Sequence, residues 1–160
     1  MKVKNIIAED FVNYQEPSLF IVTSICDFKC CKEQNIDISI CQNQEIINQP
    51  TIDISNRKIY NMYKNNPITH AIVIGGLEPM LQFDEVIDLI AYFRNHGCND
   101  DFIIYTGYNK NEISIELRYL KAYKNIIVKF GRFIPNQSPH YDDILGVDLI
   151  SDNQYAERIS

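Results

Sequence analysis

The chain has 160 residues, of which 46% are hydrophobic and 22% charged, and its formal net charge is −6. This length and composition predict one globular domain, residues 1–160, with a sizeable core. The acidic balance and the scattered lysines argue against a nucleic-acid partner, which needs clustered Lys and Arg. No apolar run approaches the roughly 20 residues that span a bilayer, and residues 1–11 turn acidic before a signal-peptide core develops. We therefore expect a cytoplasmic protein without membrane or nucleic-acid partners, in which cysteines stay reduced.

Four short apolar runs divide the chain. They contain β-branched and aromatic residues, hardly alternate with polar ones, and lead into Cys or Gly. Such runs are typical of strands buried in a parallel sheet. The runs are Leu19–Ile25, Ala71–Gly76, Phe102–Gly107 and Ile126–Gly131.

Helical periodicity appears between these runs. A first helix is predicted after the cap residue Ser55, a second from Asp84 to the stop at Gly97, and a third, weaker one over Ile113–Leu120. Strands that alternate with helices imply right-handed βαβ units. We therefore predict an α/β fold whose parallel sheet is open or curled into part of a barrel.

The loops that follow the four predicted strands carry the most unusual residues of the chain. A cysteine cluster follows the first strand, and "GGLEP", "TGY" and "GRF" follow the others. Because parallel sheets keep their chemistry at the carboxyl ends of the strands, these loops are expected to converge on one face. The segments before Leu19 and after Phe133 are less regular, and the polar tail 146–160 is expected to pack along an edge or to meet a partner.

Four of the five cysteines lie in the stretch "CDFKCCKEQNIDISIC", residues 26–41. Reduced, clustered cysteines favour a metal site. A structural zinc site usually uses two CxxC-like pairs separated by a longer loop, which this spacing fits poorly. Adjacent side chains tend to point apart, so three ligands with one spare are the more natural count. Three thiolates on an iron–sulfur cluster leave one iron open to another ligand.

Five ordered segments resemble one enzyme family. "CDFKC" resembles the first part of the CxxxCxxC motif of radical S-adenosylmethionine enzymes, and "GGLEPML" resembles their GGEP segment. "IIYTGY", "KFGRF" and "LGVDLISDNQ", together with the chain length, resemble the small activating proteins of anaerobic ribonucleotide reductase. The resemblance implies a radical S-adenosylmethionine core, in which parallel βα units form a partial, incomplete TIM-like barrel.

The match to the cysteine motif has one departure. The third cysteine of the motif would fall at Glu33. The "CQN" that begins at Cys41 reproduces the residues that commonly accompany this cysteine in the family. The resemblance therefore implies Cys26, Cys30 and Cys41 as cluster ligands, with residues 31–40 as an enlarged loop and Cys31 as a bystander.

A second departure affects the cofactor-binding residues. Leu77 separates Gly76 from Glu78, so Gly75 and Gly76 are the firmer match to the family segment. The two glycines are expected to let the backbone approach the methionine moiety. Glu78 is expected to bind its ammonium group.

The resemblance implies a 4Fe-4S cluster and S-adenosylmethionine as cofactors. Reductive cleavage of S-adenosylmethionine would give a 5′-deoxyadenosyl radical, with no catalytic side chain beyond the cluster and cofactor. Thr106 is expected to bind the carboxylate or ribose, and Phe28 to pack near the adenine. Arg132, after the fourth strand, could meet a carboxylate or the partner, and a surface salt bridge is the default expectation.

The resemblance also implies partners. The radical would abstract hydrogen from a backbone glycine of anaerobic (class III) ribonucleotide reductase, and the electron would come from a flavodoxin- or ferredoxin-type donor. Two alternatives stay open. One is a radical S-adenosylmethionine enzyme that acts on another protein or on a small molecule. The other is a non-catalytic module with a closed metal site of four cysteines that includes Cys31.

Overall fold

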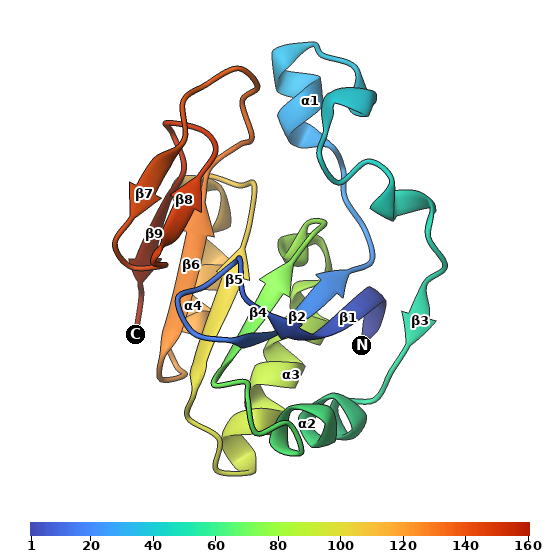
Figure 1. The fold of residues 1–160 in the computed structure, drawn as a ribbon, viewed down its shortest axis with the longest axis vertical. Coiled ribbons are helices and arrows are strands. Elements are labelled where there is room, and N and C mark those ends of the chain that lie inside the picture. Colours follow the sequence, from blue (N-terminus) through green and yellow to red (C-terminus); the bar gives the residue numbers. More distant parts are fainter.

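The four predicted strands form the centre of a seven-stranded sheet in the computed structural model, which describes residues 1–160 (Figure 1). The strand order is β3-β1-β2-β4-β5-β6-β9, and β7 and β8 make a separate two-stranded sheet. The strands are β1 (Lys2–Asp10), β2 (Ser18–Thr23), β3 (Ile52–Asp53), β4 (Ala71–Gly75), β5 (Asp101–Tyr105), β6 (Ile126–Phe130), β7 (His140–Asp142), β8 (Val147–Leu149) and β9 (Tyr155–Arg158).

The pairing confirms the predicted parallel core and adds antiparallel edges. The pairs β2–β4, β4–β5 and β5–β6 are parallel, as the continuous apolar runs predict. By contrast, β1 pairs antiparallel with β2 and β3, and β9 pairs antiparallel with β6. The expected packing of the tail along an edge is therefore confirmed, whereas the expectation of irregular structure before residue 19 is wrong. The incomplete-barrel form of the sheet stays a prediction.

The three predicted helices are present. The Ser55 hydroxyl accepts a hydrogen bond from the Lys58 backbone N–H at 3.3 Å, which confirms the predicted cap of α2. The helix α3 begins one residue before Asp84, and Gly97 follows its end with φ +79°. The α-helices are α1 (Lys29–Gln34), α2 (Asn56–Lys64), α3 (Phe83–Asn95) and α4 (Ser114–Leu120), and the 3₁₀ helices are η1 (Ile38–Ile40), η2 (Ile46–Asn48), η3 (Pro79–Gln82) and η4 (Lys110–Ile113).

The two faces of the sheet pack differently. One face contacts α2, α3 and α4 and contributes to a core of 22 buried hydrophobic residues that includes Phe93 and Phe102. The other face holds a smaller cluster of 8, which includes Ile103, Ile127 and Ala156. The helix α1 and its following turns stand apart from both clusters, beyond the carboxyl ends of the parallel strands (Figure 1). None of the helices combines the length and apolar composition needed to cross a bilayer.

Candidate functional site

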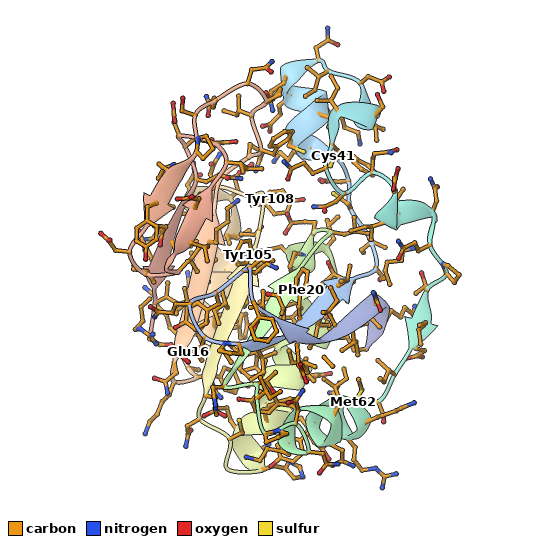
Figure 2. The ribbon with its side chains drawn as sticks, viewed as in Figure 1. Glu16, Phe20, Cys41, Met62, Tyr105 and Tyr108 are labelled. Carbon is orange, nitrogen blue, oxygen red and sulfur yellow. The ribbon has the colours of Figure 1, made fainter.

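The carboxyl ends of the parallel strands border a cavity of about 440 Å³. Its lining takes residues from each of the four loops that follow these strands, among them Cys26, Glu78, Thr106 and Arg132. The predicted convergence of the four loops is therefore confirmed. Figure 2 shows Cys41, Tyr108, Tyr105 and Phe20 around the space between the sheet and the cysteine segment, far from Met62 on α2.

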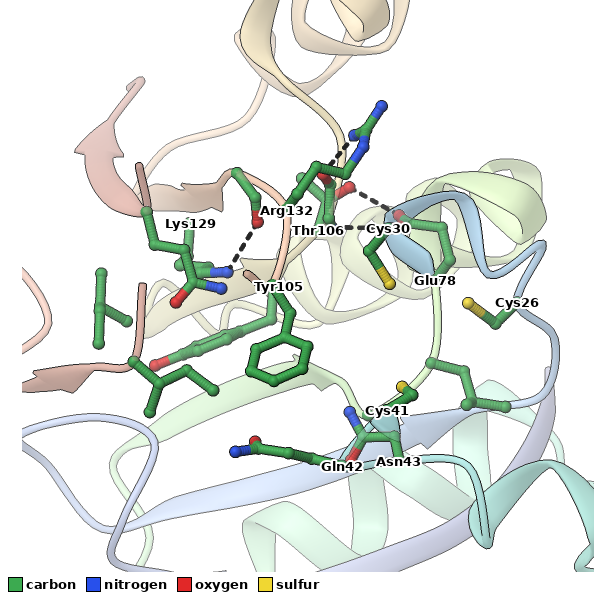
Figure 3. A pocket seen from close by; sticks show the side chains of 18 of the residues that line it. Cys26, Cys30, Cys41, Gln42, Asn43, Glu78, Tyr105, Thr106, Lys129 and Arg132 are labelled. Atoms are coloured by element: carbon green, nitrogen blue, oxygen red, sulfur yellow. Dashed lines mark hydrogen bonds between the residues drawn. The ribbon is translucent and has the colours of Figure 1, made fainter. Parts of the chain in front are cut away.

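Three cysteines line this cavity together. Cys26 follows β2, Cys30 lies on α1, and Cys41 ends η1. Their sulfur atoms face the same part of the cavity (Figure 3). Cys31 is outside the lining and only 1% exposed, with its Sγ 3.9 Å from that of Cys30. No group of three or more His, Cys, Asp or Glu side chains is close enough to hold a single metal ion. The assignment of the three ligands stays a prediction.

The segment between Cys26 and Cys41 folds into short turns. Phe28 has φ +53° and precedes α1, while Asn35, also at φ +53°, ends it. The Asp37 carboxylate then accepts a hydrogen bond from the Ser39 N–H at 2.8 Å and caps η1. The predicted enlarged loop is therefore one helical segment and one 3₁₀ turn. Phe28 lies outside the cavity lining, so its contact with an adenine stays a prediction.

The three cavity thiols differ in acidity. Burial raises the pKa of Cys26 to about 11. Interaction with Cys30 lowers the pKa of Cys41 to about 6, and the same interaction, together with burial, raises the pKa of Cys30. The thiolate is the form that binds metals. The Cys30–Cys41 pair therefore reaches this form more readily than Cys26 does.

An ion network centred on the buried Arg132 joins the cysteine segment to the sheet. The Arg132 guanidinium, in a residue only 6% exposed, donates to both carboxylate oxygens of Glu33 at 2.9 and 3.1 Å and to Glu112 at 2.7 Å. It also donates to the Gly107 carbonyl, and Lys29 pairs with Glu112. The expected salt bridge at Arg132 is therefore present, but the arginine itself is buried rather than at the surface. Glu33, which stands where the family motif has a cysteine, instead holds α1 against the loops after β5 and β6.

Glu78 reaches the cavity despite Leu77, which precedes it. Its residue is 6% exposed, and its carboxylate accepts hydrogen bonds from the Met80 N–H at 3.0 Å, the Gly107 N–H at 2.9 Å and the Thr106 hydroxyl at 2.6 Å. Burial raises the pKa of Glu78, and these three donors oppose that rise. The carboxylate is thus fixed in orientation at the edge of the cavity.

The hydroxyl of Thr106 is hydrogen-bonded to Glu78. This hydroxyl donates its proton to Glu78, and its oxygen accepts a hydrogen bond from the Tyr108 N–H at 3.0 Å. A hydroxyl has one proton to donate. In this arrangement Thr106 orients the Glu78 carboxylate, and its contact with a ligand carboxylate or ribose stays a prediction.

The two glycines after β4 are needed by the packing of the chain itself. A Cβ at Gly75 would lie 2.9 Å from Cβ of Tyr105, and a Cβ at Gly76 would lie 2.6 Å from Cγ1 of Val22. Gly76 also has φ +79°, a conformation that other residues rarely adopt. Gly76 lines the cavity and Gly75 does not. The close approach of both to a methionine moiety stays a prediction.

Sequence reasoning missed two buried polar residues of the cavity, Lys129 and Gln154, which are 6% and 5% exposed. A signal for the first was available, because Lys129 interrupts the apolar strand "IIVKF". Nothing in the sequence alone marked Gln154 as buried.

Comparisons with known proteins give a family but no individual relative. Neither the curated proteins nor the solved structures include a match to this chain. The family model described as a 4Fe-4S single cluster domain matches residues 18–149, which extend from β2 to β8 and include all four clustered cysteines. The chain belongs to the family of 4Fe-4S single cluster domains.

Proposed function

We propose that this protein is a radical S-adenosylmethionine activase that generates a glycyl radical on anaerobic ribonucleotide reductase. One observation carries the proposal. Three thiols, those of Cys26, Cys30 and Cys41, line the same cavity as the buried carboxylate of Glu78. A cluster held by three thiolates leaves one iron open, and a carboxylate beside it suits a ligand that carries an ammonium group.

The residues of the cavity fit this cofactor pair. The family supports a 4Fe-4S cluster, and the three cavity thiols supply one ligand fewer than its four irons. Cys31, buried beside Cys30, is the fourth thiol that a closed site would need, and it lies outside the cavity lining. The parallel order β2–β4–β5–β6 supports the proposal that the sheet is an incomplete barrel of the radical S-adenosylmethionine type.

The side chains would bind and orient the cofactors. When bound, the cluster supplies the electron that cleaves S-adenosylmethionine to methionine and a 5′-deoxyadenosyl radical. Glu78 would accept hydrogen bonds from the ammonium group, with its orientation fixed by Thr106 and the Gly107 N–H. Phe20 and Tyr105 would cover the cavity floor and limit access of water.

The rim of the cavity suits a macromolecular substrate. Val12 lines the cavity and is 72% exposed, and the adjacent Phe11 is 61% exposed. Exposed apolar side chains at a cavity mouth favour a protein partner that covers them. The reductase would thus close the site while presenting its glycine, and a cytoplasmic flavodoxin- or ferredoxin-type protein would supply the electron.

The proposal is tested with anaerobically reconstituted, reduced protein. Addition of S-adenosylmethionine should change the electron paramagnetic resonance (EPR) spectrum of the cluster and release methionine. Cys98→Ala is the matched control, because this buried cysteine lies outside the cavity and should not affect either readout. An unchanged spectrum without methionine release would contradict radical chemistry and favour a non-catalytic cluster domain.

The substrate is tested separately. Incubation with class III ribonucleotide reductase should produce a glycyl radical signal on the reductase. Methionine release without that signal would support a radical enzyme that acts on another protein or on a small molecule.

A further inference from the structure

One buried cation in the cavity has no counter-ion. Lys29, Lys129 and Arg132 all line the cavity, and Lys29 and Arg132 pair with the carboxylates of Glu33 and Glu112. The Lys129 ammonium has no carboxylate within 4.0 Å and donates only to the Gly131 carbonyl, at 3.1 Å. An ammonium has three donors, and its burial without a partner is costly.

The surroundings of Lys129 explain its placement. It lies on β6 two residues after Ile127, so both side chains project to the sheet face opposite the helices. Burial lowers the pKa of Lys129 to about 7, and the charge of Glu78 partly offsets that effect. Glu78 and Lys129 form no ion pair, and the Glu78 carboxylate accepts hydrogen bonds from Thr106 and the Gly107 N–H.

The wall beside Lys129 carries a second incompletely bonded group. Lys129 pairs with Ala156 across β6 and β9, so Gln154, two residues earlier, lies on the same face. Gln154 lines the cavity and is 5% exposed, and its Oε1 atom has no hydrogen-bond partner. Buried polar groups normally have partners. Figure 3 shows Lys129 on the side of the cavity away from Cys26.

We propose that Lys129 binds the carboxylate of the amino-acid group whose ammonium binds Glu78, so that the cavity selects a zwitterionic ligand. The proposal rests on the proposed function, in which this ligand is S-adenosylmethionine. Lys129 and Glu78 are held apart by their own hydrogen bonds. A ligand group that carries both an ammonium and a carboxylate would neutralise the charges of both. Charge-assisted hydrogen bonds of this kind are among the stronger ones.

The test compares two redox-inert ligands on the cluster-containing protein by equilibrium binding. S-adenosylhomocysteine carries the ammonium and the carboxylate, whereas 5′-methylthioadenosine lacks the amino-acid group. Lys129→Met should weaken S-adenosylhomocysteine binding about tenfold or more and leave 5′-methylthioadenosine binding unchanged. Lys110→Met, which removes an exposed lysine paired with Glu157, is the control and should change neither affinity.

Each contrary result has its own meaning. Unchanged binding of S-adenosylhomocysteine to Lys129→Met would overturn the role of Lys129 and leave the proposed function standing. An equal loss for both ligands would also overturn it, because Lys129 would then shape the cavity rather than bind a carboxylate. Wild-type protein that binds neither S-adenosylhomocysteine nor S-adenosylmethionine would overturn this proposal and the proposed function together.

Discussion

The two faces of the central sheet bury different kinds of side chain. The helix-covered face buries 22 hydrophobic residues around the aromatic pairs of Phe93, whereas the opposite face buries only 8. Beside the smaller cluster, the cavity holds the buried ionisable groups Glu78, Lys129 and Arg132. Hydrophobic burial is the main stabilising term in folding, and buried charges oppose it unless they are paired. The helix side therefore supplies stability that offsets the cost of burying ionisable groups on the cavity side.

The largest expected effect separates the cavity cysteines from the others. Cys41→Ala should abolish cluster binding, because Cys41 is one of only three cysteines that line the cavity. Cys31→Ala should retain the cluster, because Cys31 lies outside the lining. Iron and sulfide content after anaerobic reconstitution measures both, with Cys98→Ala as the control. Cluster loss in Cys31→Ala and retention in Cys41→Ala would show that the ligand assignment is wrong.

The second prediction concerns the helix-covered face. Phe93 is fully buried and contacts Tyr60, Tyr63 and Phe102 edge-on or tilted. Phe93→Ala should lower the free energy of unfolding by about 3–5 kcal/mol, measured with urea. The fraction that remains folded at low temperature should bind as much iron as the wild type. Loss of iron per folded molecule would mean that the two faces are not independent.

The third prediction uses the pH dependence of the cavity side. The pKa of Lys129 falls from 10.5 to about 7 on folding, so the unfolded chain binds more protons between these values. The wild-type free energy of unfolding therefore gains from this residue as pH rises from 7 to 10.5. Lys129→Met should be more stable than wild type at pH 7, by an amount on the order of a few kcal/mol.

The difference between the two proteins isolates this effect, because the other titrations are common to both. Urea unfolding at several pH values between neutral and strongly alkaline should show the advantage of Lys129→Met shrinking as pH rises. An advantage that stays constant with pH would contradict a buried, charge-bearing Lys129.

The sequence predicts the helix-covered half of this molecule better than the cavity half. The parallel strands and α2, α3 and α4 follow from apolar runs and helical period, which are local signals of burial. The strand β1 escapes prediction because only Val3 and Asp10 of its residues are buried, so it shows neither a continuous apolar run nor a clear alternation. The sequence predicts that the tail packs along an edge. Its pairing with β6 depends on residues that are distant in the sequence.

The cavity residues also divide into those that the sequence predicts and those that only the folded chain brings together. Motif and spacing place Cys26, Cys30, Cys41 and Glu78 in one cavity, since they follow strands whose ends must converge. The contact of Arg132 with Glu33 spans 99 residues, so no local pattern could reveal it. Buried polar groups satisfy one another through such long-range contacts, which only the folded arrangement of the loops brings together.

The smallest expected effect concerns this contact, which joins the two halves of the cavity. A double-mutant cycle with Glu33→Gln and Arg132→Met should give a coupling of about 0.5–1 kcal/mol in urea unfolding. The value is modest because the Glu33 side chain is 47% exposed, although that of Arg132 is only 7% exposed. The same cycle on the exposed pair Lys110–Glu157 should give no measurable coupling, since water screens both partners. Equal couplings for the two pairs would mean that the Arg132–Glu33 contact does not fasten the cysteine segment to the sheet.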